Sequence, residues 1–300
     1  MSTLMYAVHD SATMLRRNLK HAIRYPAVGL GSAMLPILML LLFVYAFGDS
    51  IGAGMGGGRA AYLEYLTPGV IIMGVAAGSM STSIAICSDM TEGIINRFRT
   101  MDITRASFMT GHVLGSVVQT MACAVLVVGV ALALGFRSGA TPLEWLAAAG
   151  LLTAIAFAVT WLSAGFGLIS KTVESASNKP LLIQFLPFLG SAFVPADSMS
   201  PGLRWFAEHQ PFTPMTETLR GLLSGTPVGN AWWISLTWCA AIALTGYLWS
   251  RHLFAKGPAT EPATARGRAR CPLRGRCQQI ESGGRQGGAE YPADQAAGGR

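Results

Sequence analysis

The sequence predicts an all-α polytopic membrane protein with six transmembrane helices, an N-terminal interfacial helix, and an outer re-entrant hairpin between transmembrane helices five and six. Composition points to a membrane protein, because 51% of the 300 residues are hydrophobic and only 12% are charged. Six apolar segments contain no Asp, Glu, Lys, Arg or His, and most reach the roughly 20 residues that a helix needs to cross a bilayer. The six segments are 28–47, 66–87, 113–136, 145–170, 180–195 and 231–250.

Charge placement is the third observation. The net charge of +7 arises mainly from basic residues between the apolar segments, so it indicates membrane topology rather than a nucleic-acid partner. The positive-inside rule places both termini in the cytoplasm, because one set of loops is richer in Lys and Arg than the other. The basic residues expected on the inner side are Arg16, Arg17, Lys20, Arg24, Arg97, Arg99, Arg105, Lys171, Lys179, Arg251 and Lys256.

Residues 1–27 precede the first apolar segment and form a separate N-terminal region. Apolar residues recur there at helical spacing, with the basic residues mostly off that stripe, which predicts a cytoplasmic helix lying in the membrane interface. The apolar positions are Leu4, Val8, Leu15, Leu19 and Ile23. A solvated basic stub is the alternative. The six-helix transmembrane domain is then expected to occupy residues 28–255.

The fifth apolar segment, 180–195, is short, and residues 196–230 after it are too polar to cross a membrane and too apolar for a free loop. Prolines interrupt this stretch and would divide it into short helices. This pattern predicts a re-entrant or interfacial helical hairpin on the outer side. The prolines are Pro195, Pro201, Pro211 and Pro214.

Residues 256–300 have a different character, rich in Arg, Gly, Ala and Pro, and cannot bury enough apolar surface to fold. This predicts a disordered basic tail. Two interpretations remain open: contact with anionic membrane lipid, or an extension without a role.

The absence of charge within the apolar segments bears on function. Ion-driven transporters and intramembrane enzymes place ionisable groups at membrane depth, and no such group occurs here. The chain also lacks a G-x-x-x-x-G-K-[ST] phosphate loop and an H-E-x-x-H motif, and its five histidines are scattered. We therefore expect no catalytic, cofactor-binding or metal site, and no enzyme activity of its own.

The richest polar stretch is residues 88–105, between the second and third apolar segments. Acidic residues stand near its start and basic residues towards its end, while Ile94, Ile95, Phe98 and Met101 recur at three- and four-residue spacing. This pattern is typical of a short amphipathic helix whose apolar ridge enters a groove on a partner protein. A charged, briefly helical loop without a partner is the alternative.

The same stretch resembles the first cytoplasmic loop of ABC transporter permeases of the second, exporter type, in particular the daunorubicin-resistance-like drug-efflux branch. The matching residues are Asp89, Glu92, Gly93, Ile94, Ile95, Arg97, Phe98, Arg99, Thr100 and Arg105. A later run is similar to the outer segment of that family. It comprises Phe193, Val194, Pro195, Met199, Ser200, Pro201, Leu203, Gln210, Pro211, Phe212, Thr213, Arg220 and Gly221.

In that family the loop is a coupling helix that docks on a separate ABC ATPase subunit. The resemblance therefore implies ATPase coupling by Asp89, Glu92, Gly93, Arg97, Phe98, Arg99 and Arg105. It also implies that the partner subunit binds the ATP, that a second permease copy completes the transporter, and that the chain lies in the bacterial plasma membrane. Two positions depart from the family pattern: Asp102 stands near the place of a usual proline, and Gly111–His112 replaces a Gly–Arg pair.

The function that follows is export of a hydrophobic or amphipathic compound, such as a drug, a secondary metabolite or a lipid-like molecule. Apolar and aromatic side chains would line its path, and the candidates are Met34, Phe43, Met73, Met80 and Phe185. The alternatives are an exporter of lipid-linked polysaccharide with the same architecture, a secondary transporter, or an integral-membrane lipid-modifying enzyme. The last two lack a membrane-embedded acid and a recognisable motif, respectively.

Overall fold

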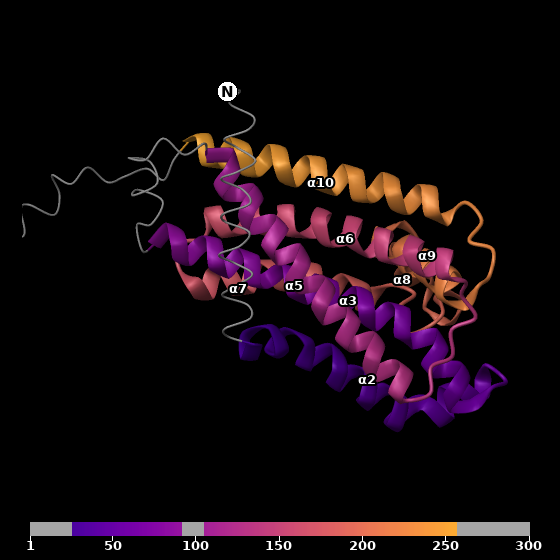
Figure 1. The fold of residues 1–300 in the computed structure, drawn as a ribbon. Helices are drawn as coiled ribbons and strands as arrows, with labels where there is room; N and C mark the ends of the chain where they lie inside the picture. The colour runs from indigo at the N-terminus through magenta and orange to yellow at the C-terminus, as the bar shows by residue number, and fades with distance from the viewer. Residues whose placement is uncertain (1–25, 92–104, 257–300) are drawn as a thin grey trace, which may run out of the picture. The chain divides into compact units, whose positions relative to one another are not determined.

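The computed structural model describes residues 26–91 and 105–256, and every regular element in these two ranges is a helix (Figure 1). This confirms the all-α fold class. The predicted interfacial helix and basic tail lie outside the described residues, as do coupling residues 92–104. Five described helices are long and apolar enough to cross a membrane. The chain is therefore a multi-pass membrane protein.

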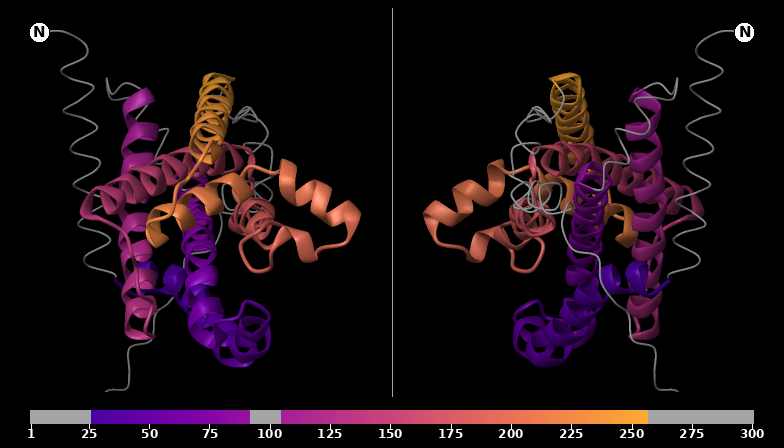
Figure 2. Two further views of the ribbon diagram at one scale, coloured as in Figure 1. Left: turned by 90° about the vertical axis from the view of Figure 1, so that its right-hand side faces the viewer. Right: turned by 90° about the vertical axis from the view of Figure 1, so that its left-hand side faces the viewer.

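The five long helices form the body of the described structure. They are α2 (Pro26–Gly54), α3 (Gly58–Thr91), α5 (Arg105–Ala133), α6 (Pro142–Ile169) and α10 (Ala231–Lys256). Shorter helices lie between α6 and α10. They are α7 (Val173–Phe185), the 3₁₀ turns η1 (Leu186–Leu189) and η2 (Ala196–Ser198), α8 (Pro201–His209) and α9 (Phe212–Ser224). The end of α3, the start of α5 and the end of α10 lie at one end of the bundle, and α8 and α9 lie at the other (Figures 1 and 2).

The long helices agree with five of the six predicted apolar segments, but the fifth segment, 180–195, does not form one spanning helix. Helix α7 begins earlier, at Val173, where the Thr172 hydroxyl accepts a hydrogen bond from the Ser175 N–H. It ends at Phe185, two residues before Pro187, because proline cannot continue the hydrogen-bond ladder and restricts the residue before it. The predicted count of six spans is therefore not confirmed in the parts of the chain that are described.

Segment 196–230 folds largely as helix, in line with the prediction of a helical hairpin. Helix α8 is followed by α9, which ends at Gly225 in the left-handed conformation, with φ of 67°. On α8, the exposed Arg204 pairs with Asp197 at 2.8 Å and with Glu208 at 2.7 Å. Re-entry of this outer hairpin (α8 and α9) into the membrane stays a prediction.

Helix α3 is the centre of the bundle. It contacts α2, α5, α6, α7 and α9, and 78% of its apolar span is buried. Polar contacts within the spans use uncharged groups: the hydroxyls of Ser79 on α3 and Ser163 on α6 lie 3.0 Å apart, and Ser83 donates to the Ala176 carbonyl on α7 at 2.9 Å. The core is therefore built around α3 without a charged residue in its middle.

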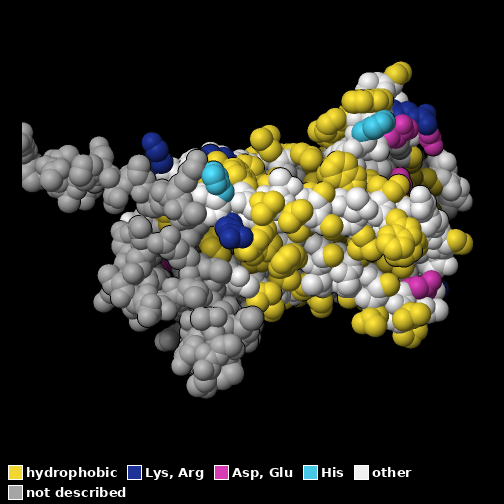
Figure 3. All heavy atoms as spheres, turned by 90° about the horizontal axis from the view of Figure 1, so that it is seen from above, with side chains coloured by type: hydrophobic (Ala, Val, Ile, Leu, Met, Phe, Trp, Pro, Cys, Tyr) yellow, Lys and Arg dark blue, Asp and Glu magenta, His cyan; other side chains and the backbone are white. Residues whose placement is uncertain are grey.

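The outer surface of the bundle is apolar along its length. Only 22% of the α2 span and 17% of the α10 span are buried, and Figure 3 shows charged side chains at the two ends of one face with hydrophobic and uncharged atoms between them. A surface of this kind suits lipid or another protein surface within the membrane.

Helices α6 and α10 pack closely through glycine. A methyl group at Gly246 of α10 would come within 2.7 Å of the Leu162 backbone nitrogen of α6, so the two backbones would have to separate. Around this contact the rings of Trp161 and Tyr247 meet edge-on at 5.0 Å, as do Phe166 and Trp249 at 5.3 Å.

We therefore expect Gly246→Ala to destabilise the protein by about 1–3 kcal/mol, the usual cost of overpacking. The matched control is Gly129→Ala on α5, where nothing lies within 4 Å of the added methyl group. Thermal unfolding of the detergent-solubilised protein, followed by size-exclusion chromatography, measures the difference. Equal midpoints for the two variants would contradict the close contact.

Candidate functional site

The predicted coupling region is described only at its two ends. Asp89 lies in the last turn of α3, which ends at Thr91, and Arg105 is the first residue of α5. Between them, Glu92, Gly93, Arg97, Phe98 and Arg99 lie outside the described residues, so their arrangement and coupling role stay predictions. The structure does show that α3 and α5 pack against each other, so both ends of the segment belong to one pair of helices.

Asp89 and His112 connect these two helices. Nε2 of His112 lies 2.9 Å from Oδ2 of Asp89, and the side chains are only 9% and 14% exposed, respectively. At this distance an Nε2–H of the imidazole faces the carboxylate in either protonation state, and the protonated ring adds a full charge–charge attraction. Such a pair fixes the end of α3 against the start of α5, the two elements that lead into and out of the coupling segment.

Sequence reasoning named Asp89 but not His112 as a site residue. The only signal was that His112 stands where the similar family has arginine. An arginine or a protonated histidine can each place a positive charge beside a carboxylate, so the contact with Asp89 gives a physical reason for a basic residue here.

The same end of the bundle holds a second set of contacts, around the end of α6. Nζ of Lys179 on α7 donates to the Ile169 carbonyl at 3.3 Å and to the Ser170 hydroxyl at 3.1 Å. The Ser170 carbonyl accepts a weak hydrogen bond from the Cys87 thiol of α3 at 3.6 Å. A lysine at the carboxyl end of a helix donates hydrogen bonds to its last carbonyl groups. Its positive charge also interacts favourably with the helix dipole.

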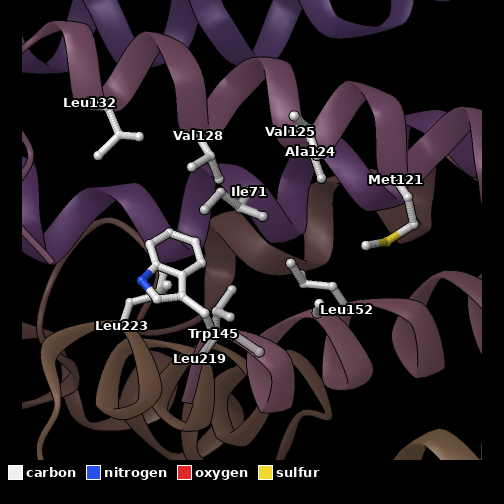
Figure 4. A pocket seen from close by; sticks show the side chains of 12 residues that line it. Ile71, Met121, Ala124, Val125, Val128, Leu132, Trp145, Leu152, Leu219 and Leu223 are labelled. Carbon is white, nitrogen blue, oxygen red and sulfur yellow. The ribbon is translucent and has the colours of Figure 1, made fainter. Parts of the chain in front are cut away.

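Two apolar cavities lie beside α9. The first has a volume of about 300 Å³ and lies between α3, α5, α6 and α9. Met121, Val128 and Leu132 point from α5 towards Trp145 and Leu152 of α6 (Figure 4). The second, of about 470 Å³, lies between α6, α9 and α10 and includes Thr218, Leu222 and Trp232. Both volumes fall within the range of small-molecule sites.

The residues predicted to line a transport path come from three helices. Met34 and Phe43 are on α2, Met73 and Met80 on α3, and Phe185 ends α7. Met34 and Phe185 are 55% and 53% exposed, whereas Met73 is fully buried in the core. Phe43 packs on Phe193 with ring centroids 4.9 Å apart. None of the five lines either of the two cavities beside α9, and their role in a transport path stays a prediction.

The described elements are all helical, and the long spans carry no charged residue in their middle. The family model described as ABC-2 type transporter matches residues 10–223, and this chain belongs to that family.

Curated relatives agree with this assignment. The daunorubicin resistance ABC transporter permease protein DrrB1 of Streptomyces coeruleorubidus is 25% identical over 239 residues, which cover 79% of this chain and 82% of the relative. The probable doxorubicin resistance ABC transporter permease protein DrrC of Mycobacterium tuberculosis is 24% identical over 219 residues, covering 72% and 77%. The relatives are named as permeases, so this chain is a transport subunit rather than an enzyme, and the predicted likeness to drug-efflux permeases is confirmed.

The Asp89–His112 pair can be tested by replacing the imidazole. His112→Gln removes the ring from beside a largely buried carboxylate and should cost about 1–3 kcal/mol of stability, whereas His112→Arg should retain stability. The control is Arg59→Gln, because Arg59 and Asp49 also lie 2.9 Å apart but are 45% and 75% exposed. An exposed pair contributes about 0–1 kcal/mol. Thermal unfolding midpoints measure these losses, and a stable His112→Gln variant would contradict an electrostatic pair.

Proposed function

We propose that this chain is the transmembrane permease subunit of an ATP-driven exporter that moves a hydrophobic or amphipathic compound out of the cell. The main support for this proposal is the family match over residues 10–223, together with relatives named as daunorubicin and doxorubicin resistance permeases. The chain has no phosphate-binding loop of its own, so a separate ABC ATPase subunit supplies the ATP site. No observation favours the polysaccharide exporter or the lipid-modifying enzyme.

The energy of ATP hydrolysis would enter through residues 89–105. Closure of the ATPase pair around nucleotide moves the segment centred on Glu92 to Arg99, and α3 and α5 carry this movement into the bundle. Helix α3 suits this role because it contacts most other helices and runs the length of the bundle to the outer hairpin. The uncharged spans support a mechanical coupling, since no embedded acid is available to couple transport to an ion gradient.

A second permease copy, identical or different, would complete the transporter, with both termini of each copy in the cytoplasm. Support comes from the apolar faces that a single chain leaves uncovered, including Met34, Leu38 and Leu42 of α2, which are 51–55% exposed. Within this assembly the path-lining residues are proposed to be Met34, Phe43, Met73, Met80 and Phe185. An apolar and aromatic wall binds drug-like amphipathic molecules better than ions.

Docking on the ATPase is tested by reversing charges in the coupling segment. Glu92→Lys combined with Arg97→Glu should abolish co-purification with the ABC ATPase partner, or lower ATP turnover in lipid by about tenfold, because reversed charges repel their partners across an interface. The matched control is Arg204→Glu combined with Glu208→Lys, which reverses an exposed pair on α8. If assembly and turnover survive in the coupling variant, the assignment is wrong.

The path is tested by truncating exposed apolar side chains of equal exposure on different helices. Met34→Ala and Phe185→Ala should raise the KM for daunorubicin in vesicle transport by about fivefold, the effect of losing about 1 kcal/mol of apolar contact. Leu244→Ala is the control, because Leu244 is 60% exposed but lies on α10. Equal KM values for all three variants would remove Met34 and Phe185 from the path.

A further inference from the structure

Between α7 and α8 the backbone is no longer a continuous α-helix, and we call this segment the break after α7. Its buried backbone groups lack helical hydrogen bonds, so side chains must supply partners for them. Ser191 follows η1 and is only 3% exposed. Its carbonyl oxygen accepts a hydrogen bond from the Tyr65 hydroxyl of α3 at 2.8 Å and another from Nη2 of Arg220 on α9, also at 2.8 Å. An irregular backbone in a membrane protein is stable only where such partners replace the missing helical hydrogen bonds.

Arg220 also contacts α3 directly. Its Nε donates to the Tyr65 carbonyl at 3.3 Å, and its guanidinium carbon lies 3.8 Å from the centre of the Tyr65 ring. Arg220, Tyr65 and Ser191 therefore form one cluster, which we name the outer clamp, joining α9, α3 and the break after α7. The break packs tightly on α3, since a methyl group at Gly69 would lie 2.6 Å from the Ala192 carbonyl oxygen.

The charge in the outer clamp is held by carbonyls and a ring rather than by an ion pair. Burial lowers the pKa of Arg220, and the nearby Tyr65 and Glu217 partly offset that effect, yet a guanidinium keeps its charge at physiological pH. Among the described residues no carboxylate lies within ion-pair distance of it. The planar guanidinium group donates to two carbonyl oxygens and stacks on the Tyr65 ring at the same time. A lysine ammonium cannot make all of these contacts.

Most of α9 is buried, and two open pockets lie beside it. Leu219 and Leu223 line the pocket of about 300 Å³, and Thr218 and Leu222 line the pocket of about 470 Å³. Outside the clamp, the polar contacts of α9 include a hydrogen bond from Ser138 to the Leu223 carbonyl at 2.6 Å and the hydroxyls of Thr218 and Ser235, which lie 2.9 Å apart. The outer clamp therefore adds a charged contact to α3 to the apolar packing and neutral hydrogen bonds that also hold α9.

We infer that Arg220 is a positioning residue for transport, which holds α9 against α3 and the break after α7 and thereby makes the outer hairpin follow the movement of α3. The inference rests on the proposed function, because α3 moves only if it is driven from the coupling segment. When α3 shifts, the clamp carries α9 with it, and the cavities on its other sides give α9 room to move.

The test uses the complete complex of permease and ATPase in lipid, with daunorubicin as the transport probe. Arg220→Gln and Arg220→Lys should each reduce ATP-driven daunorubicin uptake by about tenfold while ATP turnover stays within about twofold of wild type, because the coupling segment remains intact and only the outer end loses its connection. Arg204→Gln is the matched control, since Arg204 is an exposed cation of the same hairpin. Wild-type uptake by Arg220→Lys would overturn the inference.

Hydrogen exchange gives a second readout that requires no transport. Amides of 212–224 should exchange about tenfold faster in Arg220→Gln than in wild type or in Arg204→Gln, because α9 opens locally once the clamp is lost. Unchanged exchange would overturn the clamp. If the wild-type complex neither hydrolyses ATP nor transports, the proposed function fails, and this exchange measurement still decides whether Arg220 holds α9.

A disulfide covers the case in which Arg220 variants do not fold. Thr218→Cys with Ser235→Cys, in a chain whose five natural cysteines are serine, joins α9 to α10 in the native arrangement. Oxidation should stop daunorubicin uptake and reduction should restore it, while the cysteine-free chain taken through the same oxidation and reduction serves as the control that should keep uptake. Full uptake by the oxidised Thr218–Ser235 variant would overturn the movement of α9.

Discussion

The requirement that every backbone N–H and C=O at membrane depth has a partner within the protein determines this structure. The five long helices satisfy it by their own hydrogen bonds, and so they need no charged or strongly polar residue in their middle. The segment between Phe185 and Pro201 cannot satisfy it alone, because Pro187 ends the helix. Its buried Ser191 carbonyl accepts hydrogen bonds from the side chains of Tyr65 and Arg220. The Arg220 contact ties α9 to this segment.

Two largely buried polar contacts of the described bundle lie towards the two ends of one helix. Asp89 contacts His112 at one end of α3, and Tyr65 contacts Arg220 at the other. At 1.5 Å per residue these positions are about 36 Å apart, which is the thickness of a bilayer core with part of its interface. In the proposed function, α3 would carry displacement between these two contacts, since the packed core around it deforms little.

The spans themselves could be predicted from the sequence because the absence of charge over about 20 residues is a local property. The end of the helix at Phe185 was not predicted, because segment 180–195 contains no charged residue. Only Pro187 and Gly190 indicated an interruption there. The partners of Asp89 and Arg220 could not be predicted, since they lie on helices distant in the sequence and depend on how those helices pack. The two cavities beside α9 depend on side-chain fit and leave no sequence pattern.

Apolar walls also bear on selectivity. A hydrophobic surface distinguishes related compounds by only about 1–3 kcal/mol per methylene, because it offers no buried polar group that a wrong compound would leave unpaired. The cavities beside α9 and the exposed faces of α2 and α10 are of this kind. The exporter proposed above would then accept many amphipathic compounds with similar affinity. In that proposal, directionality comes from the timing of movements at the two ends of α3, rather than from tight recognition of one compound along its length.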